Sequence, residues 1–310
     1  NLERYIPLNL KNLKKNKANY SFLLNENGGI IDDLIISNID INGKSLLYIV
    51  YNASRKKVNE EIFFKCSPSA EIIYNKNCLF AIQGPDSIEV LKNIIQINDN
   101  LKFLDICILK YNDNEIIVSR TGYTGEDGFE ISISIKQAKN FLTEILKSEN
   151  TSLCGLGARD SLRLEAGLSL YGNELNENIT PVEAGLSWAL DKERLNDNTL
   201  NGSDILLNQL KNTPSKKKIG LICVNRSMLR NGMNLLDINK NIIGKITSAC
   251  FSPILNKSIA IAYINSEFNF QNDIFCEIRN KLELVKNTNL PFVTKKYKKT
   301  EILNEWKEIY

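Results

Sequence analysis

Short runs of β-branched and other apolar residues dominate the pattern between Tyr20 and Val50, and turn residues interrupt them. The interruptions fall at 25–29, which contains Gly28-Gly29, and at 37–45. Runs of this length bounded by Asn, Asp and Gly predict strands joined by tight turns. The positions before Tyr20 are polar and Lys-rich without a clean period. Residues 51–76 are less regular, and a helix is expected around 55–64.

The middle of the chain alternates between strand patterns and helix patterns. Asp86 is the expected N-cap of the first predicted helix, and Phe141 lies on the apolar side of the second. The predicted strands cover 78–83, 114–120 and 129–135, and the predicted helices cover 86–95, 136–148, 158–172 and 202–212.

The pattern changes after the Lys-rich stretch 213–218, because only strand patterns follow it. These strands are predicted at 219–224, 241–250, 258–264, 274–279 and 281–285, and a Ser-Pro turn joins the second to the third. We therefore place a domain boundary there. The expected fold class is α+β, with a mixed region over 1–212 and a small antiparallel sheet or barrel over 213–310.

Composition narrows the possible functions. The chain has 310 residues, 43% hydrophobic and 24% charged, which are ordinary globular values for two or three domains. Lys and Arg number 39 against 36 Asp and Glu, for a net charge of +3, too balanced to predict a nucleic-acid-binding surface. No apolar run approaches the roughly 18 residues of a membrane span, so we expect no membrane association.

The absence of histidine is the most decisive feature of the composition. His 0 excludes Ser-His-Asp and Cys-His nucleophile pairs, His-based zinc sites and imidazole acid–base catalysis. The seven cysteines form no C-x-x-C pair, which argues against a four-Cys metal site and a disulfide framework. Apolar neighbours around Cys107 and Cys223 predict buried free thiols in a reducing compartment. Catalysis must then use carboxylates, Tyr, Arg, Lys, Cys, backbone groups or a bound cofactor.

Adjacent acidic residues, Asp32 and Asp33, stand inside the otherwise apolar run 30–36. In a strand their side chains point to opposite faces, so at least one of them faces the interior or a cleft. A buried carboxylate must be hydrogen-bonded or paired. The alternative is a solvent-exposed pair at a strand end.

Two further segments combine glycine with charged residues. In 119–132 three glycines alternate with Arg120, Tyr123 and Glu130. This pattern lacks the phosphate-binding P-loop spacing and predicts a hairpin loop beside a cation or a donor-rich heterocycle, or a hairpin loop alone. In 155–188, Arg159 and Asp160 are followed by Arg163 and Glu165 within two helical turns, which a single solvated ion-pair ladder cannot explain.

The four segments 28–35, 120–131, 155–188 and 244–264 together resemble the signature blocks of the aminomethyltransferase family, the T-proteins of the glycine cleavage system. They occur in the family's order, and the resemblance runs from about Tyr20 to the C-terminus. It implies a three-domain cloverleaf, with two interleaved α+β folate-binding domains followed by a C-terminal antiparallel β-barrel. The family has a further Ser-His-Met-Gly block upstream of Asn1, so we expect part of the first domain to lie outside the printed sequence.

The resemblance also implies a reaction. The one-carbon unit of an aminomethyl group passes from the dihydrolipoyl arm of the H-protein to tetrahydrofolate, with release of ammonia. Tetrahydrofolate is then a co-substrate, no metal is expected, and the lipoylated H-protein is the partner of a monomer or weak oligomer. A cytoplasmic location is expected, with the mitochondrial matrix as the alternative.

Residue roles follow from position in the family's motifs. Asp33 matches the active-site aspartate near the reactive nitrogens of the folate, and Arg159 matches an active-site arginine that also lines the folate site. Glu130 matches the glutamate that binds the pterin. Tyr20, Asn52 and Tyr123 match further positions of the folate pocket, and Arg230 lies in a block similar to an Arg-x-Gly stretch of the third domain.

Three alternatives share this scaffold or this resemblance. One is a tetrahydrofolate-dependent demethylase, which would resemble the chain less at Asp32-Asp33. Another is a non-catalytic folate-binding protein of the iron–sulfur assembly type, whose Lys-Gly-Cys-Tyr-x-Gly-Gln-Glu block the chain lacks. The third is an inactive remnant.

Overall fold

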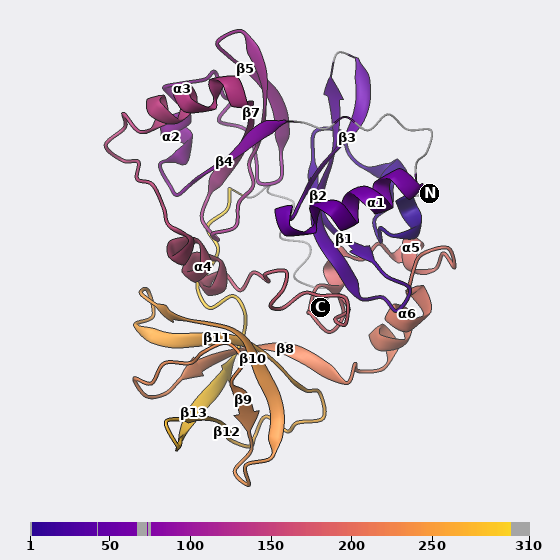
Figure 1. Cartoon of the computed structure of the whole chain (residues 1–310), viewed down its shortest axis with the longest axis vertical. Coiled ribbons are helices and arrows are strands. Elements are labelled where there is room, and N and C mark those ends of the chain that lie inside the picture. The colour runs from indigo at the N-terminus through magenta and orange to yellow at the C-terminus, as the bar shows by residue number, and fades with distance from the viewer. Residues whose placement is uncertain (1, 42, 67–72, 74–75, 299–310) are drawn as a thin grey trace.

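The computed structural model describes residues 2–41, 43–66, 73 and 76–298. They form three lobes, each built around its own antiparallel sheet (Figure 1). The first sheet holds β1 (Ala18–Leu24), β2 (Ile30–Ile41) and β3 (Lys44–Tyr51). The second has the order β4 (Asn77–Gln83), β7 (Gly128–Ser134), β6 (Asn114–Ser119) and β5 (Ile106–Tyr111). The third is a closed barrel of β10 (Ile242–Ser252), β11 (Lys257–Asn265), β8 (Lys216–Cys223), β13 (Lys281–Thr288), β12 (Ile274–Ile278) and β9 (Asn234–Leu236).

The first lobe consists of two stretches that flank the second lobe in sequence. Residues after position 170, including α5 (Lys192–Leu195) and α6 (Ser203–Lys211), return to pack on β1 and the start of β2. Phe22, Leu24 and Ile30 share one apolar cluster with Leu175 and Leu206. The two α+β lobes are therefore interleaved along the chain, as the resemblance implied.

Glycine makes this return possible where the two stretches touch. A Cβ on Gly29 would lie 1.9 Å from the carbonyl oxygen of Glu177, and Gly28 adopts a φ of +73°. No side chain larger than hydrogen fits such a close approach. The prediction of a tight turn or close backbone contact at Gly28-Gly29 is confirmed.

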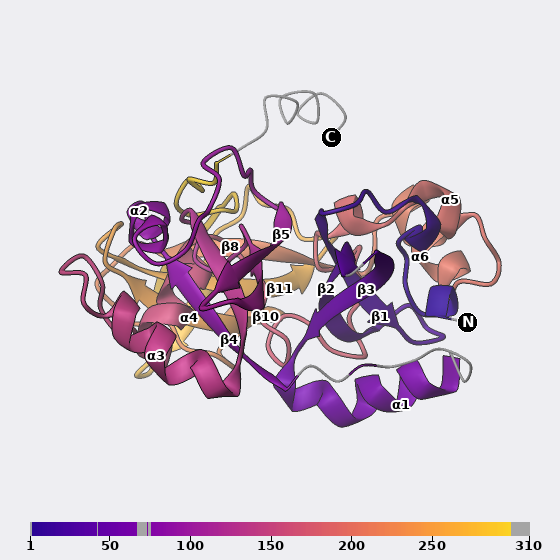
Figure 2. The same cartoon turned by 90° about the horizontal axis from the view of Figure 1, so that it is seen from above.

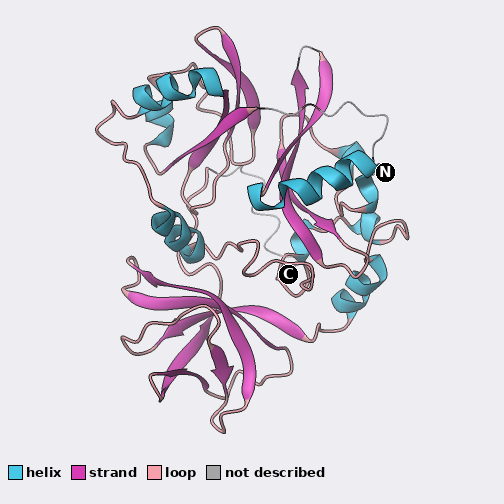
Figure 3. Cartoon of the chain, in the orientation of Figure 1, coloured by secondary structure: helices cyan, strands magenta, loops and turns pink. Residues whose placement is uncertain are grey.

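The sheets of the two α+β lobes face each other, and their helices lie away from the shared face (Figures 2 and 3). At one end the sheets are joined by apolar contacts of Ile39 with Ile106 and Ile117. Behind the first sheet, α1 (Lys56–Cys66) covers Leu34 and Ile36. Behind the second sheet lie α2 (Ser87–Lys92) and α3 (Ile135–Ile145).

A buried ion pair connects the upper lobes to the barrel. Arg163, on α4 (Leu156–Glu165), is 1% exposed and donates to Glu174 at 2.9 Å and to the Ser248 hydroxyl of β10 at 2.7 Å. Glu174 is completely buried and also accepts from the Thr247 hydroxyl of β10 at 2.5 Å. Each charge is therefore satisfied by partners from different parts of the fold, which makes this junction specific.

The segment 289–298 runs from the barrel to the second lobe. Tyr297 stacks on Phe103 with ring centroids 4.0 Å apart, and the amide of Lys296 donates to the carbonyl of Gly125. No helix among the described residues is long and apolar enough to cross a lipid bilayer.

Most predicted elements are present, and the main errors have physical reasons. The helix predicted at 158–172 ends at Glu165, because Gly167 adopts the left-handed φ of +66° and closes the helix, so Leu168 and Leu170 lie outside it. Asp86 occupies the N-cap position of α2 but makes no capping hydrogen bond through its side chain. Strands β5 and β9 were not predicted.

The expectation of buried cysteines holds only in part. Cys223 and Cys276 are buried in the barrel core, whereas Cys154 is exposed before α4. The charged residues of α4, from Arg159 to Glu165, do not form a single ion-pair ladder on one exposed face. Asp160 accepts from Arg163 at 2.8 Å, while Glu165 is buried and accepts from Ser252 of β10.

Replacing Glu174 with Gln is expected to destabilise the protein by about 1.5–3 kcal/mol, because the buried Arg163 charge then keeps only the half-exposed Asp160 as a counter-charge. Urea unfolding of the purified variant measures this change. Glu115→Gln removes an exposed carboxylate of β6 and is the matched control, with an expected change below about 0.5 kcal/mol. Equal stability of the two variants would contradict a structural role for the pair.

Candidate active site

Strand β2 presents Asp32 and Asp33 to opposite faces of the first sheet. The antiparallel register pairs Asp33 with Phe22 and Asp32 with Leu23 of β1. Because side chains alternate along a strand, Asp33 shares its face with Ile35 and Ser37, which look toward the second lobe. Asp32 points to the opposite side. The sequence prediction that the two carboxylates diverge is therefore confirmed.

The Asp33 carboxylate is held by two neutral donors. The Tyr20 hydroxyl of β1 donates to Oδ2 at 3.0 Å, and the Asn52 side-chain amide donates to Oδ1 at 2.7 Å. Burial raises the pKa of the Asp33 carboxyl to about 6; the Tyr20 hydrogen bond opposes this rise and the charge of Asp32 adds to it. No cation pairs with Asp33 among the described residues, so its negative charge stays available to a ligand.

Asp32 positions Asn52 from the other side of the strand. It is completely buried and accepts from the Asn52 amide group at 2.7 Å and from Asn59 of α1 at 2.5 Å. Burial raises the pKa of Asp32, and these amide donors counteract the rise. One nitrogen of Asn52 thus bridges both aspartates. The family resemblance pointed to Asn52, but only the fold shows that Asp32, itself held by Asn59, fixes its orientation.

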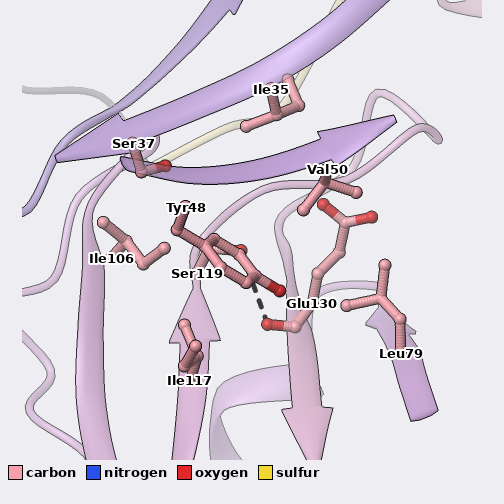
Figure 4. Close-up of a pocket in the computed structure, with 9 residues that line it drawn as sticks. All are labelled: Ile35, Ser37, Tyr48, Val50, Leu79, Ile106, Ile117, Ser119 and Glu130. Atoms are coloured by element: carbon pink, nitrogen blue, oxygen red, sulfur yellow. Dashed lines mark hydrogen bonds between the residues drawn. The ribbon is translucent and has the colours of Figure 1, made fainter. Parts of the chain in front are cut away.

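A cavity separates the facing sheets beside Glu130 (Figure 4). Its volume is about 10 Å³, close to the room that one water needs, so a larger ligand would enter only if the facing side chains move apart. Ile35, Ser37, Tyr48 and Val50 line it from the first lobe, and Glu130 lines it from β7. Asp33 is the next residue along the face of β2 that carries Ile35. Its side chain therefore lies on the face of β2 that borders the gap, one step along the strand from the residues that line the cavity.

Glu130 keeps one carboxylate oxygen available to a ligand. Its Oε2 accepts from the Thr121 hydroxyl at 2.6 Å, while Oε1 has no hydrogen-bond donor among the described residues. Arg120 and Asp127 form a side-chain ion pair that fixes the loop between β6 and β7, from which Thr121 comes. A carboxylate in a narrow, partly apolar gap suits a flat heterocycle that offers an amino group and a ring N–H.

Tyr123 and Arg159 form a second group of predicted site residues. The Arg159 guanidinium lies over the Tyr123 ring, 4.9 Å from its centroid, and the Tyr123 hydroxyl donates to the carbonyl of Ser169 at 2.5 Å. Burial raises the pKa of Tyr123, the charge of Arg159 lowers it and that of Asp33 raises it. Both charges thus lie near one ring. Arg230 lies on an exposed loop of the barrel and contacts none of these side chains through a hydrogen bond or ion pair in the described part of the chain.

Trp188 is a site neighbour that sequence reasoning did not identify. Its ring stacks on Tyr20 with centroids 5.7 Å apart, and the residue is 65% exposed although its neighbours Ala189 and Leu190 are buried. Trp188 is the last residue of the segment 155–188, whose charged residues supplied the functional predictions. An aromatic residue next to a run of small residues gives no sequence signal that separates a site wall from a core position.

Comparison with known proteins agrees with this geometry. The model of the GCVT N-terminal domain matches residues 1–194, and that of the glycine cleavage T-protein C-terminal barrel domain matches 216–294. The chain belongs to the aminomethyltransferase family. The mitochondrial aminomethyltransferase of Mus musculus is 36% identical over 310 residues, which cover 96% of this chain and 75% of the mouse protein. That of Dictyostelium discoideum is 38% identical over 318 residues, with 96% and 78% covered.

A solved structure of the family shares the architecture. The glycine cleavage system aminomethyltransferase T from Bartonella henselae superimposes with a TM-score of 0.89 at 33% identity, covering 96% of this chain and 82% of that one. The α+β cloverleaf with a C-terminal barrel is therefore confirmed as a family fold. The names of the mouse and Dictyostelium relatives place those two proteins in mitochondria, which agrees with the alternative location rather than with the cytoplasm.

The raised pKa of Asp33 makes stability depend on pH. Since about 6 lies above the ordinary 3.8, the folded protein binds this proton more tightly than the unfolded chain does. The resulting stabilisation is complete below 3.8 and is lost as pH rises through about 6. We expect Asp33→Asn to unfold with about 2–3 kcal/mol more free energy than the wild type near neutral pH, and with little difference at acid pH.

Chemical denaturation across this pH range measures the effect. Asp273→Asn, which removes an exposed carboxylate of the barrel lobe, should leave the pH dependence as in the wild type. An Asp33→Asn curve parallel to the wild-type curve at every pH would show that the carboxyl is not desolvated.

Proposed function

We propose that the chain is the aminomethyltransferase of a glycine cleavage system. It would transfer the one-carbon unit of the aminomethyl group on a dihydrolipoyl arm to tetrahydrofolate, releasing ammonia and forming 5,10-methylenetetrahydrofolate. The observation that carries the proposal is the pair Asp33 and Glu130 on the facing sheets of a family member. Neither carboxylate has a cationic partner among the described residues; Glu130 lines the gap between the sheets, and Asp33 lies on the face of β2 that borders it. Folate supplies the nucleophilic nitrogens that accept the carbon unit, and the protein supplies orientation and electrostatics.

Asp33 would act through its charge. As ammonia leaves, positive charge develops on the one-carbon unit, and an ionised carboxylate fixed beside it lowers the energy of that state. Tyr20 and Asn52 hold both carboxylate oxygens, so little reorganisation is needed at the moment of reaction. A group whose pKa is about 6 is ionised near neutral pH yet remains poorly solvated, which strengthens its interaction with a cation.

Glu130 would select the pterin. Its free oxygen and the Thr121-bound oxygen can accept two parallel hydrogen bonds from an amino group and a ring N–H. The aliphatic side chains of Ile35 and Val50 would contact the faces of the ring. Tyr123 and Arg159 would line the route from the pterin toward the remainder of the folate, with Arg159 available to a carboxylate.

The partner and the location are further parts of the proposal. A lipoylated H-protein would deliver the substrate, because the aminomethyl group of the proposed reaction is carried on its dihydrolipoyl arm. The mitochondrial matrix is the compartment that the relatives favour. We assign folate binding to residues 1–212 and the supporting barrel to 213–310.

A reconstituted turnover assay tests the proposal. The complete protein is combined with a lipoylated H-protein carrying the aminomethyl group and with tetrahydrofolate, and both ammonia and methylenetetrahydrofolate are measured. Equal amounts of the two products are expected. A demethylase would instead turn over methylated sulfur or nitrogen compounds, and a binding protein or an inactive remnant would release neither product.

Replacing Asp33 with Asn is expected to lower kcat by about 10²–10³-fold, because the amide lacks the charge that opposes the developing cation. The KM for tetrahydrofolate should change much less, since the amide can still accept from Tyr20. Steady-state kinetics of the assay above measure both values. Wild-type turnover in Asp33→Asn would exclude this carboxylate from the mechanism.

Replacing Glu130 with Gln is expected to weaken binding of a reduced folate by about 10–100-fold, equivalent to roughly 1–3 kcal/mol for a charged hydrogen-bonded pair. Calorimetric titration with 5-formyltetrahydrofolate measures the loss. Glu115→Gln, on the neighbouring strand and exposed, is the control. Unchanged affinity in Glu130→Gln would move the pterin site elsewhere.

A further inference from the structure

Three basic side chains near Tyr123 lack an acidic partner. Lys218 of β8, Lys295 of the segment 289–298 and Arg159 of α4 make no salt bridge within the described part of the chain. Neighbouring basic residues behave differently, since Lys216 pairs with Glu183 and Lys296 with Glu126. What distinguishes Lys218 and Lys295 from exposed lysines without a salt bridge is that both are partly buried beside Arg159 and Tyr123.

The three side chains come from different elements and lie close to Ser169 and to the loop that contains Tyr123 and Gly125. Lys218 donates from Nζ to the Ser169 hydroxyl at 2.8 Å, and the Ser169 carbonyl accepts from the Tyr123 hydroxyl at 2.5 Å. Arg159 covers the ring of the same tyrosine. Lys295 runs past Gly125, where its Cγ would lie 3.8 Å from a Cβ built on that glycine.

The local charge is unbalanced toward the positive. The nearby Arg163 is already neutralised by Glu174 and Asp160. Lys218 and Lys295 are both only partly exposed, and burial lowers the pKa of each, that of Lys218 to about 8. The charge of Glu174 partly offsets this effect at Lys218, whereas Lys295 and Arg163 add to it. Holding poorly solvated ammonium groups together without a counter-ion is unfavourable, which makes the group receptive to an anion.

We propose that Lys218 and Lys295, beside Arg159, form a carboxylate-receiving site that determines affinity for the acidic end of the folate co-substrate. Neither lysine belongs to the site residues recognised from motifs. The proposal rests on the proposed function, since it takes the occupant to be the co-substrate of the neighbouring active site.

The position of Tyr123 favours this occupant. The Arg159 guanidinium lies over its ring, and the charges of both Arg159 and Asp33 act on the pKa of its hydroxyl, so the basic group begins close to the proposed reaction centre. A folate has its heterocycle at one end and its glutamate carboxylates at the other. With the pterin between Glu130 and Asp33, an extended molecule passing Tyr123 would bring those carboxylates to Lys218 and Lys295.

A matched pair of ligands tests the site. The complete protein is titrated by calorimetry with 5-formyltetrahydrofolate and with its dimethyl ester, which keeps the pterin and removes the negative charges of the tail. We expect the wild type to bind the free acid at least about tenfold more tightly than the ester. Lys218→Met and Lys295→Met should each reduce this preference severalfold, mainly through weaker binding of the acid, whereas Lys218→Arg should retain it.

Controls separate recognition from structure. Lys286→Met removes an exposed lysine of the barrel and should keep the wild-type preference. Lys218→Met should also raise the melting temperature of the unliganded protein, because it removes an unpaired, poorly solvated charge. A lowered melting temperature together with an unchanged acid-to-ester ratio would make Lys218 a structural residue and overturn the proposal.

Two further outcomes are equally decisive. A wild type that binds acid and ester equally well would overturn the tail site while leaving the pterin site intact. A wild type that binds neither ligand would overturn the proposed function itself, so the two failures are distinguishable.

Discussion

The candidate active site depends on charged side chains that are poorly solvated and have no oppositely charged partner in the described part of the protein. Asp33 is held by a tyrosine hydroxyl and an amide rather than by a cation, although burial raises its pKa to about 6. A nearby lysine or arginine would lower that pKa and stabilise the fold. It would also neutralise the charge before any substrate arrived. The fold therefore retains an unfavourable group at the point where positive charge is expected during the reaction.

The positive charges of this region come from other elements of the fold than the acidic groups do. In the described part of the chain Asp33 and Glu130 have no cationic partner. Glu130 lines the gap between the two sheets and Asp33 lies on the face of β2 that borders it, while Lys218 and Lys295 lie near the barrel. Such a division suits an elongated ligand with donor groups at one end and carboxylates at the other. The acidic and basic groups stay apart because they belong to different parts of the fold. The buried Arg163–Glu174 pair joins α4 to the barrel, and the close contact at Gly29 fixes the two stretches of the first lobe, so the charges cannot collapse onto one another.

The sequence was sufficient where chemistry and local pattern coincide. Asp32 and Asp33 stand in a clear strand pattern, so their divergence could be predicted, and the motifs around Glu130 and Arg159 identified the family. The helix at 158–172 was overextended because its leucines continue past Gly167, whose left-handed conformation is not visible in an apolar pattern. Strand β9 is three residues long and is defined by its barrel neighbours rather than by its own residues.

A residue whose role depends on contacts between distant parts of the chain could not be predicted from its local sequence. Lys218 stands in the run 216–218, where three lysines look alike, yet one pairs with Glu183, one lies over the ring of Phe270 and one reaches Ser169. Strand alternation separates Lys217 from its neighbours, but nothing local separates Lys216 from Lys218. Their difference arises from what the other lobes bring to that face of the barrel. Lys218 differs from Lys216 in having no carboxylate partner among the described residues, and this difference is visible only in the folded structure.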